Sequence, residues 1–243
     1  MTGIGSESEA TSQGKRMQTE PTNRGIHVNV TRTRVTLLVF NLTIISLMLS
    51  LLPASAPGTD HVVRENLTSY VALFIGFCLT LLGLWWLLSS QDFDAEGLSR
   101  PWSFTLGSIT THLALSQTVT AFMHTYLVGI TSAVEVSQPL VTDGTRTLFG
   151  LGALGDTAVL FLFGMGGSIW ILLTYVAPLI TSLKSPVPAR WRWGFAGYYL
   201  ALQSPVYWVY ARAFHLQYVP AEQPEHMLSL FALQFAQPVI WFR

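Results

Sequence analysis

Residues 69–89 read SYVALFIGFCLTLLGLWWLLS, a run of 21 residues without a charged side chain. A helix needs about 20 mostly apolar residues to cross a bilayer, so this run has the length and composition of a transmembrane helix. Four further runs, 35–52, 104–130, 157–180 and 193–214, are also long and mostly apolar. A sixth run, 227–242, is shorter. The sequence therefore predicts an all-α fold, a polytopic membrane bundle of five to six transmembrane helices.

Little of the chain remains for a soluble domain. Of the 243 residues, 50% are hydrophobic and only 11% are charged. Residues 1–34 are rich in Ser, Thr, Glu and Gln and have almost no apolar content, which predicts a disordered cytoplasmic tail. Residues 35–243 then form one transmembrane domain. The expected partner is the lipid bilayer, with other membrane subunits or a second copy of the chain as further candidates and no nucleic acid.

Lys and Arg fall mostly on alternate loops. With the N-terminus in the cytoplasm and six spans, ten of the 13 basic residues lie on the cytoplasmic side, and Arg64, Arg146 and Arg212 lie outside. Translocated loops are poor in Lys and Arg. This distribution predicts an integral protein of the plasma or inner membrane with a cytoplasmic N-terminus.

The last run leaves the number of spans open. Residues 227–242 are short for a full crossing, and Gln234, Gln237 and Pro238 stand near their C-terminal end. The run could lie in the interface or dip into the bilayer. Arg243 directly after it favours a return to the cytoplasm, so we expect six spans.

The third run, 104–130, carries an unusual number of polar side chains. At 100° per residue, a slanted stripe along one flank is formed by Ser108, His112, Ser116, Thr120 and His124, and Thr110 and Gln117 extend it. Such a helix should be surrounded by protein or should line water. We expect the hydroxyls to bond back to their own helix or to join helices. The two histidines are functional candidates, because ionisable side chains at membrane depth usually serve function.

The fourth run begins beside a cluster of glycines and an acid. Residues 150–155 match the G-x-G-x-x-G pattern of dinucleotide folds, but that motif requires a preceding strand, and here it adjoins a membrane helix. These glycines, with Gly164, Gly166 and Gly167, more plausibly let helix backbones approach closely. Asp156 has two interpretations, a helix N-cap near the interface or a buried functional carboxylate. We expect it at a depth similar to that of His124.

Several chemistries are excluded or narrowed by the side chains present. Cys78 is the only cysteine, which excludes internal disulfides and cysteine-based metal clusters, and no metal site is predicted. His112 and His124 share one helix and stand about 18 Å apart along it, so they cannot ligate one haem together. Haem or pigment binding through either histidine alone, or with the sulfur of Met123 or Met165, stays open.

Two functions follow as hypotheses. The first is a small transporter or channel component that passes protons, cations or a small solute along the third helix; its candidate residues are His112, Ser116, Gln117, Thr120, His124 and Asp156. Histidine titrates near neutral pH and can relay protons, and a nearby carboxylate would favour its charged form. The alternative is a non-catalytic accessory or haem- or pigment-binding subunit of a membrane redox complex. An enzyme ranks last, because no nucleophile–base pair is evident.

Overall fold

The computed structural model describes residues 21–51, 66–90, 101–137, 152–185, 187–218 and 227–241. Within these ranges the chain is almost entirely helical and contains no strand, which confirms the all-α part of the expected fold class. The long helices are α2 (Pro21–Leu51), α4 (Leu67–Ser89), α5 (Pro101–Ser137), α6 (Gly152–Ile171) and α8 (Arg192–Tyr218). A π-helical turn, η2 (Leu172–Val176), joins α6 to α7 (Ala177–Lys184), and the short 3₁₀ turn η3 (Ala189–Trp191) precedes α8.

Among the described residues, three helical segments are long and apolar enough to cross a membrane: Arg32–Ser50, Leu67–Ser89 and Gly155–Lys184. They correspond to the first, second and fourth runs of the sequence. The helices of the third and fifth runs, α5 and α8, are 37 and 27 residues long but more polar. Large apolar side chains such as Phe40, Phe74 and Phe161 point outward, with 60%, 68% and 68% of their surface exposed. The molecule therefore has the exterior of a membrane-associated helical bundle.

The N-terminal boundary of the first helix differs from the expectation. The helix α2 begins at Pro21 and so includes residues 21–34, which the sequence assigns to a disordered tail. Residues 1–20 of that tail lie outside the described residues.

The sixth run is not one helix. It forms α9 (Met227–Gln234) and α10 (Gln237–Ile240), separated by a turn at Phe235 and Ala236. Pro238 explains the break, because a proline lacks the amide hydrogen and its ring clashes with the carbonyl four residues earlier, here that of Gln234. At a rise of about 1.5 Å per residue, neither piece can cross a bilayer, so the expectation of a continuous sixth spanning helix is wrong.

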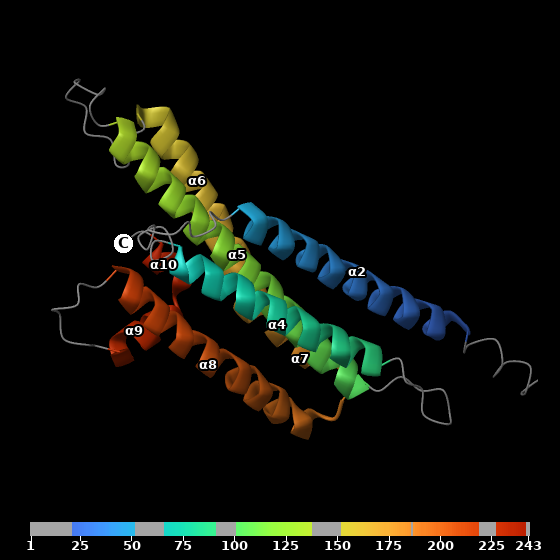
Figure 1. The fold of residues 1–243 in the computed structure, drawn as a ribbon. Helices are drawn as coiled ribbons and strands as arrows, with labels where there is room; N and C mark the ends of the chain where they lie inside the picture. Colours follow the sequence, from blue (N-terminus) through green and yellow to red (C-terminus); the bar gives the residue numbers. More distant parts are fainter. Residues whose placement is uncertain are drawn as a thin grey trace, which may run out of the picture.

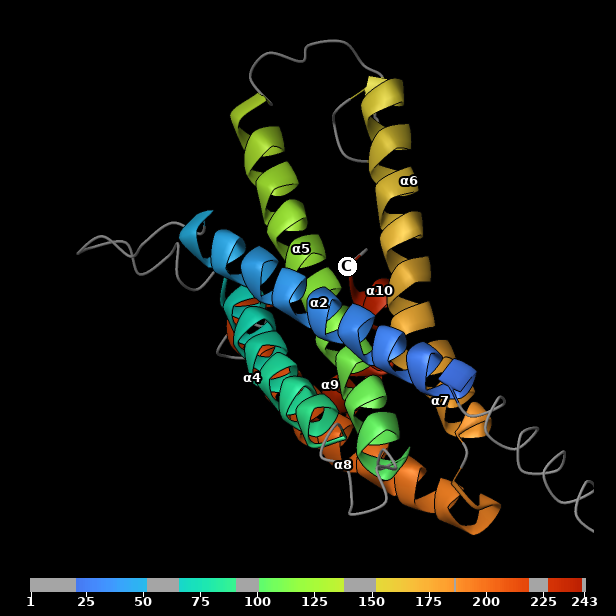
Figure 2. The same ribbon diagram turned by 90° about the vertical axis from the view of Figure 1, so that its right-hand side faces the viewer.

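The central element is α5, which packs against α2, α4, α6, α7 and α8. Its most extensive partner is α4, which runs beside it, while α2 crosses the pair obliquely (Figures 1 and 2). Three glycines allow the close approach of α4 and α5. A Cβ atom built on Gly107 would lie 2.8 Å from Cγ of Leu87, and one built on Gly76 would lie 3.4 Å from Cβ of Gln117. On the α2 side, a Cβ on Gly83 would meet a Leu38 methyl group at 3.3 Å.

The C-terminal helices α9 and α10 connect two sides of the bundle. The helix α9 packs along α8, whereas α10 packs against α6 and lies near the middle of the molecule (Figure 2). A Cβ atom on Gly167 of α6 would lie 3.1 Å from Cβ of Pro238. The break in the sixth run thus inserts α10 beside α5 and α6.

Candidate functional site: the polar helix and His124

The polar stripe of α5 is enclosed by protein. Ser108, Ser116 and Thr120 are fully buried, Gln117 is 1% exposed and His124 is 2% exposed. These side chains therefore face neighbouring helices rather than lipid, which is one of the two surroundings expected for such a helix.

The hydroxyls of the stripe bond to the carbonyls of their own helix. Ser108 donates to the carbonyl of Phe104 at 2.6 Å, Ser116 to Leu113 at 2.8 Å, and Thr120 to Ser116 at 3.1 Å. This arrangement confirms the expectation for the hydroxyls, and it satisfies their donors without any ligand.

The same helix also bonds to its neighbours. The amide of Asn41 on α2 donates to the Thr80 hydroxyl of α4 at 3.0 Å and accepts from Thr118 of α5 at 2.8 Å. The indole nitrogen of Trp170 on α6 donates to the Thr120 hydroxyl at 3.0 Å.

Two tyrosines of α8 complete these contacts. The Tyr210 hydroxyl donates to Oε1 of Gln117, and the Tyr198 hydroxyl lies 2.7 Å from that of Thr110. Of the candidate residues, Gln117 and Thr120 thus join α5 to other helices, whereas Ser116 bonds only within α5.

The two histidines of α5 have different surroundings. His112 is partly buried, and its Nε2 lies 3.4 Å from the Thr181 hydroxyl of α7. His124 is almost fully enclosed, and neither of its ring nitrogens has a hydrogen-bond partner of ordinary geometry. A neutral imidazole carries one donor and one acceptor, so His124 buries two unsatisfied polar atoms. Their desolvation lowers the stability of the fold, which argues against a purely structural role.

The polar side chain beside His124 comes from the broken helix. Gln237 of α10 interacts with the imidazole, is 1% exposed, and has an Oε1 atom without a partner. Its Nε2 donates to Oε1 of Gln234, the last residue of α9, at 2.5 Å. His124, Gln237 and Gln234, hereafter the His124 cluster, form a polar site where α10 meets α5 and α6.

Asp156 belongs neither to the His124 cluster nor to a helix cap. The helix α6 begins at Gly152, so Asp156 lies inside the helix, and the N-cap interpretation is wrong. Its side chain is 8% exposed and makes an interaction within the protein. A Cβ on Gly166 would meet the sulfur of Met123, the neighbour of His124, at 2.6 Å. Asp156 lies ten residues before Gly166, about 15 Å along the axis, so its depth differs from that of His124.

A second polar group lies around the π-helical turn, and the sequence pattern did not identify it. The Tyr199 hydroxyl donates to the carbonyl of Thr174 at 3.0 Å. The Tyr175 hydroxyl donates to the carbonyl of Phe235, which the break between α9 and α10 leaves free. Buried atoms without a partner remain on Gln203 and Tyr207. Gln203 inside an apolar run was the one sequence signal for this group, and π-helical turns often occur at functional sites.

No group of three or more His, Cys, Asp or Glu side chains in the described part of the chain could hold a metal ion. Comparisons with models of protein families, with curated proteins and with solved structures gave no match. The described residues therefore define the class, an all-helical bundle with three helices long and apolar enough to cross a membrane and with polar side chains in its interior.

Proposed function

We propose that the protein is a small transporter or channel component that passes protons, cations or a small polar solute, with His124 as the group that binds the passing species. The observation that carries the proposal is the enclosed imidazole, whose two ring nitrogens have no hydrogen bond of ordinary geometry and which lies beside Gln237 of the broken helix α9–α10. The neutral ring offers one donor and one acceptor and titrates near neutral pH in water. Among the three species, a proton or an uncharged polar solute matches these groups best.

The helix break supports the proposal independently. In many membrane transporters the substrate site lies where a discontinuous helix ends at membrane depth, because irregular backbone is tolerated there only beside protein or water. The break at Phe235 and Ala236 brings the buried Gln237 to the imidazole and the buried Gln234 to Gln237. We place the passing species at the His124 cluster rather than along the whole length of α5, since the stripe hydroxyls already have partners.

We further propose five complete spans with a cytoplasmic N-terminus, and a C-terminal segment that enters the bundle from the outer side. The spans are Arg32–Ser50, Leu67–Ser89, α5, Gly155–Lys184 and α8. Without a sixth crossing Arg243 leaves the cytoplasmic set, and nine of the 13 basic residues remain there. This distribution still follows the positive-inside rule.

Reporter fusions test the topology. Fusions after residues 58 and 140 should report the outside, and fusions after residues 96 and 186 should report the cytoplasm. A reporter after residue 243 should report the outside or stay inactive, because five spans leave the C-terminus away from the cytoplasm. The inverse pattern at the first four positions would overturn the orientation, and a cytoplasmic C-terminus would restore the sixth crossing.

Thiol accessibility tests the function. In a Cys78→Ala background, single cysteines at positions 124 and 237 should react with a water-soluble thiol reagent, because thiolates form only where water reaches. Cysteines at 116 and 120 should stay unmodified, since the hydroxyls at these positions already have partners within the protein, unlike the unpartnered atoms of His124 and Gln237. Position 122, where Phe122 is 54% exposed on the outer face, is the control for contact with lipid and should also stay unmodified.

The alternative function is that of an accessory subunit. The packing of α5 favours this alternative, because its polar side chains bond to other protein groups. Nearly every polar side chain of the stripe bonds to its own helix or to another helix, as in a scaffold. If positions 124 and 237 proved as inert as 116 and 120, the interior would be dry and this alternative would replace transport. Haem or pigment binding at His124 is disfavoured by its 2% exposure, which leaves no room for a macrocycle in this packing.

A further inference from the structure

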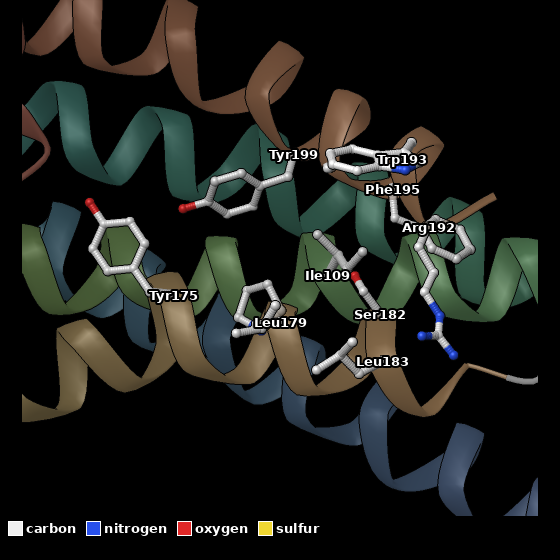
Figure 3. A pocket seen from close by; sticks show the side chains of 11 residues that line it. Ile109, Tyr175, Leu179, Ser182, Leu183, Arg192, Trp193, Phe195 and Tyr199 are labelled. Atoms are coloured by element: carbon white, nitrogen blue, oxygen red, sulfur yellow. The ribbon is translucent and has the colours of Figure 1, made fainter. Parts of the chain in front are cut away.

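A lateral cavity of about 420 Å³ lies between α7 and α8, and neither histidine of α5 lines it. Its walls are almost entirely apolar and come from Leu179 and Leu183 on α7 and Phe195 on α8, with Ile109 of α5 as the floor (Figure 3). Its volume falls in the range of small-molecule sites, about 300–1,000 Å³. An apolar cavity of this size in a membrane protein suits a hydrocarbon chain.

The two ends of the cavity differ in chemistry. Tyr175 and Tyr199 close one end with their rings, and their hydroxyls point away from the cavity (Figure 3). Arg192 stands at the other end, close to the loop that joins α7 to α8 (Figure 3). The cavity is thus apolar along its length and charged at one end.

The charged end has the composition of a headgroup region. Trp193 is 83% exposed there and also lines the cavity. The guanidinium of Arg190 lies 6.0 Å from the ring centre of Trp191. Tryptophan and arginine together are typical of the level at which a helix leaves the bilayer. Arg192 makes no ion pair with a carboxylate in the described ranges.

We propose that this cavity binds one acyl chain of an anionic phospholipid, with the lipid phosphate against Arg192. The apolar walls contact the acyl chain, and the surrounding bilayer provides lipid at a high local concentration. The guanidinium takes the phosphate, because its planar fork of donors matches phosphate oxygens. The proposed topology places Arg192 on the cytoplasmic side, where anionic lipids give the membrane its negative surface potential.

The test measures lipid retention by the full-length protein. The protein is delipidated in detergent and reloaded with equal amounts of phosphatidylglycerol and phosphatidylcholine that carry the same acyl chains. Native mass spectrometry then counts the retained lipids. The wild type should retain phosphatidylglycerol about fivefold over phosphatidylcholine, the preference expected from one basic side chain near the headgroup.

Three variants distinguish the contribution of the acyl chain to lipid binding from that of the headgroup. Arg192→Gln should lose the preference for phosphatidylglycerol but still retain one lipid. Ala196→Phe, which fills the cavity from its α8 wall, should retain neither lipid. Arg190→Gln, in the same loop but outside the cavity lining, should behave like the wild type.

Two results would overturn the proposal. Equal loss of preference in Arg190→Gln and Arg192→Gln would show that only the overall surface charge matters. If a folded Ala196→Phe protein retained as much lipid as the wild type, the acyl chain would bind outside this cavity. If Ala196→Phe failed to fold, the comparison of the two arginine variants would still decide, because both side chains are exposed and their replacement leaves the core intact.

Discussion

Replacement of His124 by leucine is expected to raise the free energy of unfolding while it abolishes flux. The imidazole buries two ring nitrogens without partners, and an unsatisfied buried polar group costs about 1–3 kcal/mol. Leucine removes both polar atoms, which are buried without a hydrogen bond of ordinary geometry. The variant should therefore be more stable by about 1–3 kcal/mol, measured by unfolding in mixed micelles. Its flux in liposomes should fall to that of protein-free vesicles.

Asn41→Leu is the matched control, because Asn41 is also fully buried but has partners on two helices. Its loss removes two interhelical hydrogen bonds, which average about 0.6 kcal/mol each in membrane proteins. This variant should be less stable by about 1 kcal/mol and should keep its flux once it is folded. If His124→Leu were destabilised like Asn41→Leu, the imidazole would have a structural partner, and the functional role assigned to it would fail.

Replacement of Gly107 by alanine is expected to destabilise the bundle strongly for so small a change. The added Cβ would lie 2.8 Å from Cγ of Leu87 and 3.1 Å from its backbone nitrogen. Those atoms move only if α4 moves, and overpacking of this kind costs about 1–3 kcal/mol. Thermal unfolding in detergent should show the loss as a lower midpoint.

Two other glycines provide controls of graded severity. At Gly129 on the same helix an added Cβ would have no neighbour within 4 Å, so alanine should be neutral or stabilising by up to about 1 kcal/mol through helix propensity. At Gly166 the nearest atoms belong to the flexible side chain of Met123, which can turn aside, so the cost should lie between the other two. Equal effects at Gly107 and Gly129 would show that α4 and α5 are less closely packed than described.

The glycines also show where sequence reasoning was incomplete. The sequence singled out Gly164, Gly166 and Gly167 for close helix approach. Gly166 and Gly167 indeed face neighbours, whereas a Cβ on Gly164 would have none within 4 Å. The glycines of the largest interface were not singled out: Gly76 and Gly83 stood in the apolar run 69–89, and Gly107 stood among the polar residues of the third run. A glycine in an apolar run carries no information about its facing residue, because the contact depends on which helix packs against it.

The polar residues of α5 likewise show what the sequence could and could not predict. The polar residues of α5 and their need for a protein environment could be read from the sequence, since hydroxyls and imidazoles cannot face lipid without cost. The sequence could not show which of these side chains would find hydrogen-bond partners. Thr120 receives its partner from Trp170, 50 residues away, and Gln117 from Tyr210, 93 residues away. Partners this distant are fixed only when the helices pack.

The sequence alone determined the helical class and the positions of the main helices, because runs of apolar residues must close their backbone hydrogen bonds internally. It also indicated the membrane setting and raised the two histidines as candidates. Only the tertiary structure separated them, by placing the Thr181 hydroxyl within hydrogen-bond distance of His112 and leaving both ring nitrogens of His124 without a hydrogen bond of ordinary geometry. Only the tertiary structure also placed the broken segment α9–α10 beside α5. The physical reason is that helix formation is governed by neighbours along the chain, whereas the burial and pairing of a polar atom are governed by whichever helices surround it.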